Sequence, residues 1–558
     1  MSPAAVEHAV SAPETVAKQI LWSIAGNDSG GGAGLSADAR AAEAFDVHLC
    51  PVVAAITAQN SRAVTQVAPI APDLLDAQLA ALADDLPPAA IKTGLLGSAA
   101  NIEVVARWVD RLRARDPRVA LVVDPVLGAS SGAAFADEAV LRAYRELLLP
   151  HATLVTPNER EARRLVAGLG EGALDTADLS IPAVAQALRA TGTAAVAITG
   201  GDSAHAPGWS LDWVDTPQAS GWLALPRIDT PHTHGTGCSF ASSAAAALAR
   251  GFVPADALVL AKMATTHALR QGHAAGRGAG PVAARAGFAN DASLMPFMSW
   301  GENFDFDSCS RLIDGDWKAI SSGKLSDDGL YAIVDGAARV RQVVQAGAKL
   351  VQLRIKTPEA GEAPDAAGHA ALREAIAQSL AACRAAGATL VVNDHWRLAA
   401  ELAAGDSASL AVHLGQEDVL ALGDAGRAEL AASGLKLGLS SHSLWELARA
   451  RSLAPWYAAC GPVWPTLTKA MPWRPQGLGN LAWWVHMAGV PVVAIGGILE
   501  PAQATQAAQS GASAACVVRG LGDAPAATLP VWRAAIEAGR AAPRLAVPAW
   551  PQPSLAPG

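Results

Sequence analysis

A cysteine behind two glycines is the first candidate for chemistry. In the stretch PHTHGTGCSF, residues 231–240, Gly235, Thr236 and Gly237 precede Cys238, and small apolar residues follow. A Gly-Thr-Gly turn that leads into a helix exposes backbone N–H groups, and the helix dipole favours negative charge there. The same field lowers the pKa of a thiol. The stretch therefore predicts an anion site with a proton acceptor at its rim, as phosphoryl transfer to a hydroxyl needs, although a small buried cysteine would have the same pattern.

Two further segments of the first half could bind phosphates. AGNDSGGGAGLSAD, residues 25–38, is a glycine-rich loop between a strand and a helix, and it matches neither of the two common nucleotide-binding loops. TPNEREA, residues 156–162, follows a strand-like run and places Asn158 and Glu161 where a metal–phosphate assembly could sit. The alternative for Glu161 is an ordinary solvated charge on a helix.

In the second half, polar residues follow one strand-like run after another. The carboxylates Asp394 and Asp418 are the oxygen ligands that Mg²⁺ prefers, and Arg354, Lys356 and Lys469 would neutralise a diphosphate. A single charge at a strand end is usually a loop salt bridge, but that explanation would have to hold at six or more strands. The pattern predicts a diphosphate site with Mg²⁺. The residues at these strand ends are Gln352, Arg354, Lys356, Asn393, Asp394, Gln416, Glu417, Asp418, Ser440, Gly496, Gly497 and Arg519, with PTLTK at 465–469.

The elements that must position these residues alternate between strands and helices. Up to about residue 290, apolar runs such as QILWSIAG and VALVVDPV alternate with alanine-rich stretches, which predicts an α/β fold with a mostly parallel sheet. From residue 329, eight strand-like runs alternate with helical stretches over roughly two hundred residues, which predicts a closed (β/α)8 barrel. We expect a disordered N-terminal tail (1–17), a first domain (18–290), a linker with one short helix (291–324), a barrel domain (325–545) and a C-terminal tail (546–558).

Composition limits the classes of partner. The 558 residues are 51% hydrophobic and 17% charged, with a formal net charge of −9 at pH 7. This composition supports large cores and argues against nucleic acid or an anionic membrane surface as the main partner. The sequence has no transmembrane-length apolar run, no signal-peptide pattern and no C-x-x-C pair among its six cysteines. We therefore expect a reduced, cytoplasmic protein without a disulfide framework.

Several motifs of the first half together resemble one enzyme family. Their order and spacing are similar to those of the hydroxymethylpyrimidine kinase/phosphomethylpyrimidine kinase family over about residues 18–290. The resemblance implies a ribokinase-like α/β/α sandwich that uses ATP to phosphorylate 4-amino-5-hydroxymethyl-2-methylpyrimidine to the monophosphate and then to the diphosphate. The motifs are AGNDSGGGAGLSAD (25–38), TAQN (57–60), IKTGLLGS (91–98), DPV (124–126), TPNEREA (156–162), THGTGC (233–238) and GRGAGPV (276–282).

This resemblance also implies roles for single residues. Cys238 falls on the catalytic base, and the backbone of Gly235, Thr236 and Gly237 on the anion hole. Leu95 replaces the family's usual methionine and conserves its volume. Thr199 stands where the family often has a lysine that reaches the ATP phosphates; loss of that cation could weaken ATP binding, although the threonine hydroxyl can still donate a hydrogen bond. The pyrimidine pocket maps onto Gly26, Asp38, Gln59, Leu95 and Val126, and the Mg²⁺–ATP region onto Asp124, Asn158, Glu161 and Thr199.

The second half closely resembles thiamine phosphate synthase over about residues 329–540. That family joins hydroxymethylpyrimidine diphosphate to 4-methyl-5-(2-hydroxyethyl)thiazole phosphate, with release of diphosphate. The motifs are QLRIK (352–356), VND (392–394), VHLGQED (412–418), GLSSHS (438–443), GPVWPTLTK (461–469) and VVAIGGI (492–498). The resemblance implies Gln352, Arg354, Lys356, Asn393, Ser440 and Lys469 for the pyrimidine diphosphate, Thr466, Thr468, Gly497, Val518 and Arg519 for the thiazole phosphate, and Asp394 and Asp418 for Mg²⁺.

Two departures from the synthase pattern are visible. The chain between Asp394 and Asp418 is a few residues longer than usual, which a surface loop can absorb. Arg519 stands where the family has a serine, and an arginine there holds phosphate but reshapes the thiazole pocket.

Together, the two resemblances predict a bifunctional transferase of thiamine biosynthesis, with ATP as co-substrate, Mg²⁺ as cofactor and small molecules as partners. Two alternatives stay open for the first half. It could phosphorylate pyridoxal-like alcohols, or it could be a weakened pyrimidine-binding module beside an active synthase. A homodimer is expected by resemblance only.

Overall fold

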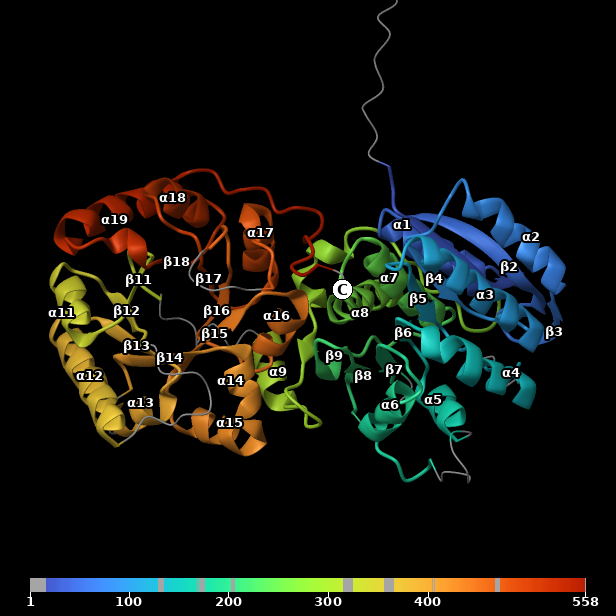
Figure 1. Ribbon diagram of the computed structural model, residues 1–558, viewed down its shortest axis with the longest axis horizontal. Coiled ribbons are helices and arrows are strands. Elements are labelled where there is room, and N and C mark those ends of the chain that lie inside the picture. Colours follow the sequence, from blue (N-terminus) through green and yellow to red (C-terminus); the bar gives the residue numbers. More distant parts are fainter. Residues whose placement is uncertain are drawn as a thin grey trace, which may run out of the picture.

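The computed structural model describes residues 17–128, 135–167, 169, 176–201, 206–314, 325–355, 366–403, 405, 407–466 and 472–556. These residues form two lobes that lie side by side (Figure 1). A ten-stranded sheet organises the first lobe, and a closed barrel of eight strands organises the second. The predicted fold class, an α/β/α sandwich followed by a TIM barrel, is confirmed.

The sheet of the first lobe has a parallel centre and antiparallel edges. Its strand order is β10-β9-β8-β7-β6-β5-β4-β1-β2-β3, and the pairs from β2 through β1, β4, β5 and β6 to β7 are parallel. The apolar runs QILWSIAG and VALVVDPV correspond to the parallel strands β1 and β5. The strands are β1 (Ile20–Asp28), β2 (His48–Gln59), β3 (Val64–Pro69), β4 (Ala90–Thr93), β5 (Ala120–Val123), β6 (Leu154–Val155), β7 (Val196–Thr199), β8 (Trp209–Asp215), β9 (Ser220–Pro226) and β10 (Phe297–Met298).

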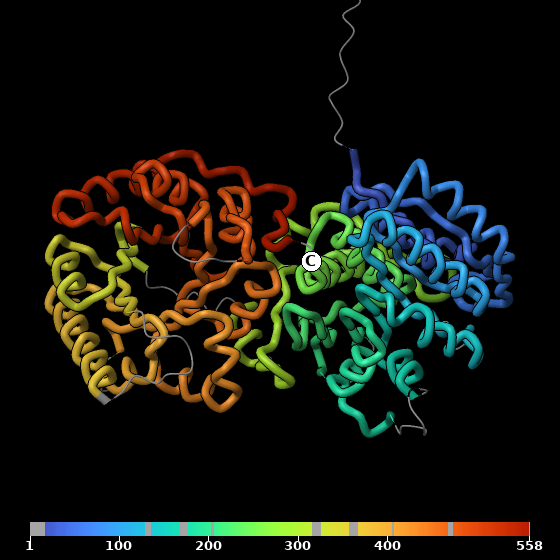
Figure 2. Tube along the Cα trace, in the orientation of Figure 1, coloured from blue at the N-terminus to red at the C-terminus, as the bar shows by residue number. Residues whose placement is uncertain are grey.

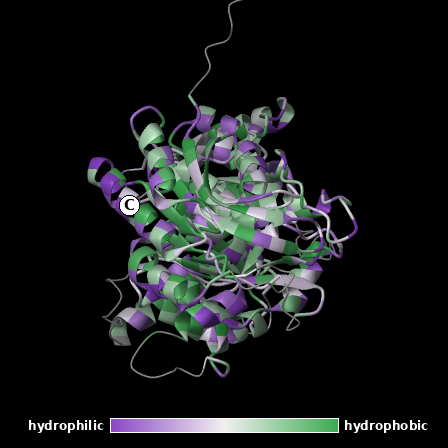
Figure 3. Ribbon diagram, turned by 90° about the vertical axis from the view of Figure 1, so that its right-hand side faces the viewer, coloured by the Kyte–Doolittle hydropathy of each residue, from purple (hydrophilic) through white to green (hydrophobic). Residues whose placement is uncertain are grey.

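Helices cover both faces of this sheet because its strands are apolar on both faces. In β1, Leu21 packs on one side of the sheet and Trp22 on the other, as the two-residue period of a strand requires. Figure 3 shows hydrophobic strands at the centre of the lobe, with hydrophilic residues gathered around them. The helices of this lobe are α1 (Gly34–Ala44), α2 (Pro72–Ala83), α3 (Ala99–Arg115), α4 (Glu138–Ala143), α5 (Glu159–Val166), α6 (Ile181–Arg189), α7 (Thr236–Ala249) and α8 (Pro254–Arg270).

All eight strands predicted for the second half are present, and they close in chain order from β11 to β18. The strands are β11 (Leu330–Val334), β12 (Leu350–Leu353), β13 (Thr389–Asn393), β14 (Leu410–Leu414), β15 (Lys436–Ser441), β16 (Tyr457–Cys460), β17 (Val492–Ala494) and β18 (Ala514–Val517). The helices outside the barrel are α11 (Ala337–Gln345), α12 (Ala366–Ala385), α13 (Trp396–Ala403), α14 (Gln416–Ala421), α15 (Gly423–Ala432), α16 (Leu444–Arg451), α17 (Gly477–Met487), α18 (Pro501–Gln509) and α19 (Pro525–Ala541).

The segment expected to be a linker belongs structurally to the first lobe. Its described part contains the expected short helix, α9 (Phe306–Ile313), and also strand β10, which pairs with β9 as the last strand of the sheet. A two-residue strand carries no periodic signal, so the sequence does not reveal it. Residues 315–324 lie outside the described residues.

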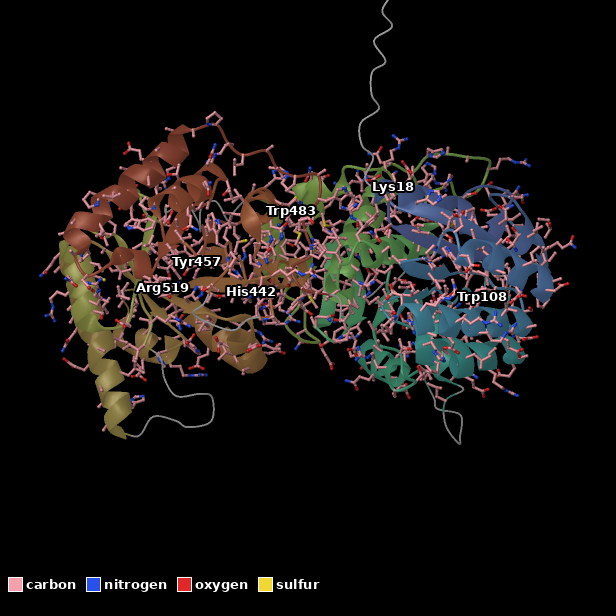
Figure 4. All side chains as sticks on the ribbon, turned by 45° about the horizontal axis from the view of Figure 1, so that its top comes forward. Lys18, Trp108, His442, Tyr457, Trp483 and Arg519 are labelled. Carbon is pink, nitrogen blue, oxygen red and sulfur yellow. The ribbon has the colours of Figure 1, made fainter. Side chains whose placement is uncertain are left out.

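The two lobes share an apolar interface with specific polar contacts. Helix α16 of the barrel packs against α8 and β10 of the first lobe. The Arg449 side chain donates to the carbonyl of Ser220 at 3.0 Å. The indole of Trp483 donates to the carbonyl of Ala289 at 2.7 Å, and Figure 4 places Trp483 near the boundary between the lobes. Because one apolar core runs through both lobes, we expect their relative orientation to be fixed by packing.

The segment that the sequence marks only as a C-terminal tail packs between the lobes. Figure 2 shows the chain end at their junction. The Trp550 ring lies 5.2 Å from Phe45 and 5.1 Å from Phe288, and the guanidinium of Arg250 lies 4.5 Å from its centre. Tail residue Gln552 accepts and donates hydrogen bonds with barrel residue Asn480. Among the described helices, none is long and apolar enough to cross a membrane.

Candidate active sites

A cavity of about 800 Å³ opens at the carboxyl ends of the parallel strands in the first lobe. This is where ligands bind in open α/β sheets. Its wall brings together nearly all of the residues that the sequence singled out in this half, although they lie at or just after the ends of six strands and at the starts of two helices. The predicted residues that line it are Gly26, Gln59, Leu95, Asp124, Val126, Asn158, Glu161, Thr199, Gly235, Thr236, Gly237 and Cys238.

Helix α7 begins at this cavity, as the sequence predicts. Gly235 precedes the helix with a φ of +85°, and a Cβ at this position would lie 2.2 Å from the carbonyl oxygen of Gly32. Only glycine fits because the backbone of the 29–33 loop touches it. The close approach of these two glycine segments places the first amides of α7 and the side chain of Cys238 on the cavity wall.

Replacing Gly235 by alanine tests this close approach. We expect Gly235→Ala to lower the free energy of unfolding of the first lobe by about 1–3 kcal/mol, because it combines a positive φ with a backbone clash. Phosphorylation of the pyrimidine should fall with it. Gly237→Ala is the matched control, since Gly237 lies in the helical turn with no atom within 4 Å of an added Cβ. Equal losses of stability in both variants would contradict the packing argument.

The thiol of Cys238 behaves differently from the sequence-based expectation. Burial raises its pKa to about 12, and the charges of Asp124 and Asp38 act in the same direction. The nearby Lys92 ammonium and the backbone N–H of Gly34 favour the thiolate, but they do not outweigh the loss of water. The predicted lowering of the pKa by the helix dipole is therefore wrong for the free protein, whose thiol is neutral at pH 7.

Lys92 is a buried cation that the sequence analysis missed. Its side chain is 0% exposed, comes from β4 and contributes to the cavity wall. The Nζ atom lies 3.1 Å from Asp38 Oδ1 and 3.4 Å from Asp124 Oδ2. These carboxylates raise the pKa of Lys92 although burial opposes them, so the ammonium stays charged. A lone lysine within an apolar strand, as in AAIKTGLLG, is the signal that could have revealed it.

Asp38, predicted to bind the pyrimidine, lies behind Lys92 and is not part of the cavity wall. Its carboxylate accepts hydrogen bonds from the hydroxyls of Ser23 at 2.6 Å and Ser242 at 2.7 Å, and it pairs with Lys92. All of these side chains are buried and have no contact with solvent. This arrangement makes Asp38 a positioning residue for the lysine.

A pair of carboxylates faces the cavity beside Lys92. Burial raises the pKa of Asp124, and burial together with the charge of Asp124 raises the pKa of Glu161 to about 7. Glu161 also closes a capping box at the start of α5. The backbone N–H of Asn158 donates to the Glu161 carboxylate, and the Asn158 side chain accepts from the backbone N–H of Glu161. The two carboxylates destabilise each other, and a divalent cation would relieve this repulsion.

The sequence-predicted Gln59 is held in a polar cluster at one end of the cavity. Gln59 lies 3.4 Å from His234 Nε2 and accepts a hydrogen bond from Thr57. His234 also contacts Asp28 at 2.9 Å, and Asp28 accepts from the amides of Gly30, Gly32 and Ala33. Burial opposes ionisation of Asp28, but these hydrogen bonds hold its pKa below the usual value. Asp28 and His234 were not predicted.

Thr199 ends β7 beside the cavity, where it donates to the carbonyl of Pro157. A second buried lysine contributes to the wall close by. Lys262 of α8 pairs with Asp212 at 2.7 Å, and Asp212 also accepts from the backbone N–H of Gly200, the residue after Thr199. The cavity therefore contains a cation near the position where Thr199 lacks one, and the sequence analysis did not predict it.

The barrel places its predicted site residues at the carboxyl ends of its strands. Gln352 and Asn393 are buried, and Ser440 is half-buried beside His413. Val518 and Arg519 follow β18 and are exposed; Figure 4 shows Arg519 in the same lobe as Tyr457 and His442. The predicted Arg354 is exposed at the end of β12. Three other predicted residues, Lys356, Thr468 and Lys469, lie outside the described residues.

The turns near the predicted thiazole phosphate residues are tightly packed. Gly497 follows β17 with a φ of +73°, and a Cβ there would lie 2.6 Å from the Cβ of Trp464. This contact brings the turn after β17 against the loop after β16, which carries Thr466. The barrel therefore brings Gly497 close to the segment that carries Thr466.

The two predicted metal ligands follow neighbouring strands. Asp394 comes directly after β13 with a φ of +66°, and Asp418 lies in the first turn of α14, after β14. One oxygen of Asp418 accepts from the N–H of Gly415 at 2.9 Å. Within the described part of the chain, no three His, Cys, Asp or Glu side chains gather as a metal site. Two carboxylates are enough for Mg²⁺ when phosphate oxygens complete its shell.

Known proteins match each lobe separately and both lobes together. The family described as phosphomethylpyrimidine kinase matches residues 28–283, and the one described as thiamine monophosphate synthase matches residues 330–521. A hydroxymethylpyrimidine/phosphomethylpyrimidine kinase of Synechococcus elongatus is 42% identical, covering 48% of this chain and 97% of the relative. A thiamine-phosphate synthase of Rhizobium etli is 46% identical, covering 34% of this chain and 85% of the relative.

A solved pyridoxal kinase of Staphylococcus aureus in complex with ADP is 29% identical, with a TM-score of 0.42 over 48% of this chain and 93% of that chain. The chloroplastic thiamine biosynthetic bifunctional enzyme of Arabidopsis thaliana is 32% identical and covers 86% of this chain and 85% of its own length. This bifunctional relative matches both lobes of the chain in one polypeptide. This chain belongs to the family of bifunctional thiamine biosynthetic enzymes, in which an ATP-dependent hydroxymethylpyrimidine/phosphomethylpyrimidine kinase is fused to a thiamine-phosphate synthase.

Proposed function

We propose that the cavity of the first lobe binds the pyrimidine alcohol between Gln59 and Cys238, with the ATP phosphates towards Asn158 and Thr199. The observation that carries this assignment is the convergence of the α7 amides, Cys238 and Lys92 on one cavity wall. The α7 amides would stabilise the transferred phosphoryl group, because charge develops on its oxygens. Gly26, Leu95 and Val126 supply the apolar wall that an aromatic ring needs.

Cys238 is proposed to accept the proton of the pyrimidine hydroxymethyl group. Burial keeps the free thiol neutral, so this role needs groups that favour the thiolate. Lys92 and the N–H of Gly34 are such groups. The proposed base thus depends on Lys92, whose positive charge is fixed by Asp38.

Mg²⁺ is proposed for both lobes. In the first lobe, Asp124 and Glu161 would hold it, because they are hard oxygen donors, one buried and one half-buried, on the cavity wall beside the proposed phosphate region. In the second lobe, Asp394 and Asp418 would hold it. When bound, the cation neutralises phosphate charge, which stabilises a leaving diphosphate more in the transition state than in the ground state.

For the second lobe, we propose that Gln352, Asn393 and Ser440 bind the pyrimidine diphosphate, together with Arg354, Lys356 and Lys469. Thr466, Thr468, Gly497, Val518 and Arg519 are proposed to bind the thiazole phosphate. The support is the common position of those among them that the structure describes, at the carboxyl ends of the barrel strands, where TIM-barrel enzymes place their active sites. The thiazole nitrogen would then attack the methylene carbon that the diphosphate leaves.

The remaining expectations are also proposals. We assign the kinase to residues 18–290 and the synthase to 325–545. A cytoplasmic location is supported by the six cysteines, all of which are free. A homodimer is proposed from the resemblance of both halves to families that often self-associate.

The experiment that tests the proposed kinase site follows thiamine phosphate formation by the purified full chain. The substrates are hydroxymethylpyrimidine, thiazole phosphate, ATP and Mg²⁺. Cys238→Ala should lower phosphorylation by roughly 10²- to 10⁴-fold, as loss of a general base does. Synthesis should return when pyrimidine diphosphate is supplied. Cys50→Ala is the matched control, because Cys50 is a buried cysteine of β2 that does not line the cavity.

Other outcomes separate the alternatives. If the wild-type chain itself needs added pyrimidine diphosphate, the first lobe is a binding module. Thr199→Lys is then the first substitution to test. If pyridoxal is phosphorylated better than the pyrimidine, the proposed role of Gln59 in substrate choice is wrong.

A further inference from the structure

A chain of buried hydrogen bonds crosses the interior of the barrel. It runs from Gln352 through Tyr331 and Tyr457 to His413 and Ser440, which lie on five different strands. Gln352 Nε2 donates to the Tyr331 hydroxyl at 3.0 Å, and the two tyrosine hydroxyls are 2.7 Å apart. The Tyr457 hydroxyl is 2.9 Å from His413 Nδ1, and His413 Nε2 is 2.8 Å from Ser440 Oγ.

This chain has a direction because an amide N–H can only donate. The hydroxyl oxygen of Tyr331 accepts from Gln352, so its proton is free to donate to Tyr457. The proton of Tyr457 then goes to Nδ1 of His413. A neutral imidazole that accepts at Nδ1 carries its proton on Nε2, and it donates that proton to Ser440 Oγ. The hydrogen-bond chain does not use the hydroxyl proton of Ser440, so this proton can point away from His413.

Burial supports a neutral histidine in this chain. Tyr331, Tyr457 and His413 are all buried, while Ser440 is half-buried at the end of the chain. Burial is the main cause that lowers the pKa of His413 to about 4, and interactions with Arg354 and His442 contribute in the same direction. The imidazole thus donates one hydrogen bond and accepts one at pH 7.

Gly438 shows that the backbone is adapted to this chain. It lies on β15, two residues before Ser440, and a Cβ there would lie 2.1 Å from Cζ of Tyr457 and 2.4 Å from its hydroxyl oxygen. The Tyr457 ring also stacks on the His413 ring at 5.7 Å and 15°. Only glycine allows the ring to reach His413 across this strand.

We propose that Tyr331, Tyr457 and His413 are positioning residues that fix the Ser440 hydroxyl as a hydrogen-bond donor to the anionic pyrimidine diphosphate. This inference rests on the proposed role of Ser440 as a ligand of that substrate. Without the Tyr457 hydroxyl, His413 can carry its proton on Nδ1 and accept at Nε2. Ser440 would then donate to His413 and turn its lone pairs, rather than its proton, towards the diphosphate.

A double-mutant cycle on Tyr457 and Ser440 tests this inference in the full chain. Tyr457→Phe keeps the ring and removes only the hydroxyl. With pyrimidine diphosphate supplied, we expect Ser440→Ala and Tyr457→Phe each to lower kcat/KM for this substrate by about tenfold, as loss of a hydrogen bond to a charged group does. In the Ser440→Ala background, Tyr457→Phe should cost less than about twofold, because its effect passes through Ser440.

Two controls distinguish positioning from general damage. KM for the thiazole phosphate should stay unchanged in both single variants. Kinase turnover by the same protein should also stay unchanged, because the first lobe is untouched.

The possible results distinguish the directional hydrogen-bond chain from the ligand role of Ser440. If Tyr457→Phe lowers kcat/KM equally with and without Ser440, or lowers it in neither background, the directional chain is wrong while Ser440 remains a ligand. If Ser440→Ala has no effect, the proposed ligand role fails, and the inference fails with it.

Discussion

Replacing Lys92 by methionine is expected to abolish phosphorylation of the pyrimidine while leaving the synthase active. Methionine has a similar length but no charge, so the change leaves Asp38 and Asp124 as buried carboxylates without their cation. Breaking a buried ion pair by removing one partner typically costs about 3–5 kcal/mol. The first lobe should therefore lose stability as well as the group that favours the Cys238 thiolate.

The two effects of Lys92→Met can be separated. In the double variant Lys92→Met/Asp38→Asn, one of the two unpaired buried carboxylates is neutralised, and part of the lost stability should return. Kinase turnover should not return, because the proposed base still lacks its cation. Thermal unfolding of the full chain measures the first effect, and phosphorylation with supplied ATP and Mg²⁺ measures the second.

A stable Lys92→Met protein that keeps full kinase turnover would overturn this interpretation. Thiamine phosphate formation from supplied pyrimidine diphosphate is the internal control for the barrel. Recovery of kinase turnover in the double variant would show that Lys92 acts only by balancing Asp38.

The barrel was readable from the sequence because its strands are buried on both sides and evenly separated by helices. Runs such as LAVHLGQ and TLVVND are continuous and apolar, and each ends in polar residues where the active site must lie. The antiparallel strands β3, β8, β9 and β10 were not predicted; the first three are partly exposed, and β10 is only two residues long.

The motif residues of the kinase could be found because glycine and polar residues follow its strands. The buried charges that shift the pKa values of these residues could not be found. Lys92 and Lys262 lie inside apolar elements, where sequence alone does not show which carboxylate faces them. The pKa of Cys238 was predicted in the wrong direction for the same reason. The helix dipole can be read from the sequence, whereas the amount of protein around the thiol depends on distant segments.

The hydrogen-bonded chain in the barrel could not be predicted from the sequence either. Tyr331 and Tyr457 are 126 residues apart and meet only because the barrel closes. Each tyrosine alone resembles an ordinary core residue of a strand. The role of Trp550 was hidden likewise, since the residues that receive it come from both ends of the first lobe.

Neutralising Asp256 is expected to stabilise the interface between the lobes above pH 7. This aspartate lies in the first turn of α8, is 1% exposed, and accepts a hydrogen bond from the N–H of Trp445 at the start of barrel helix α16. Burial raises its pKa to about 7, and the charge of Glu446 adds to the shift. The backbone N–H groups of Trp445 and Leu444 act in the opposite direction.

The sign of the pH dependence follows from this raised pKa. Below about pH 4, the carboxyl group is protonated in both the folded and the unfolded chain and costs nothing. Between about pH 4 and pH 7, the unfolded chain ionises while the folded chain holds its proton, so stability falls as the pH rises. A shift of about three pKa units corresponds to roughly 4 kcal/mol lost by pH 8.

Asp256→Asn removes this loss, because the amide oxygen still accepts from the N–H of Trp445 and carries no charge. We expect the variant to match the wild type at about pH 3, where the carboxyl group is protonated in both states, and to exceed its unfolding temperature at pH 8, as measured by thermal unfolding of the full chain. Comparing the two proteins at each pH cancels the other titrating groups. A variant that is less stable than the wild type at pH 8 would mean that the ionised carboxylate holds the lobes together through the positive end of α16.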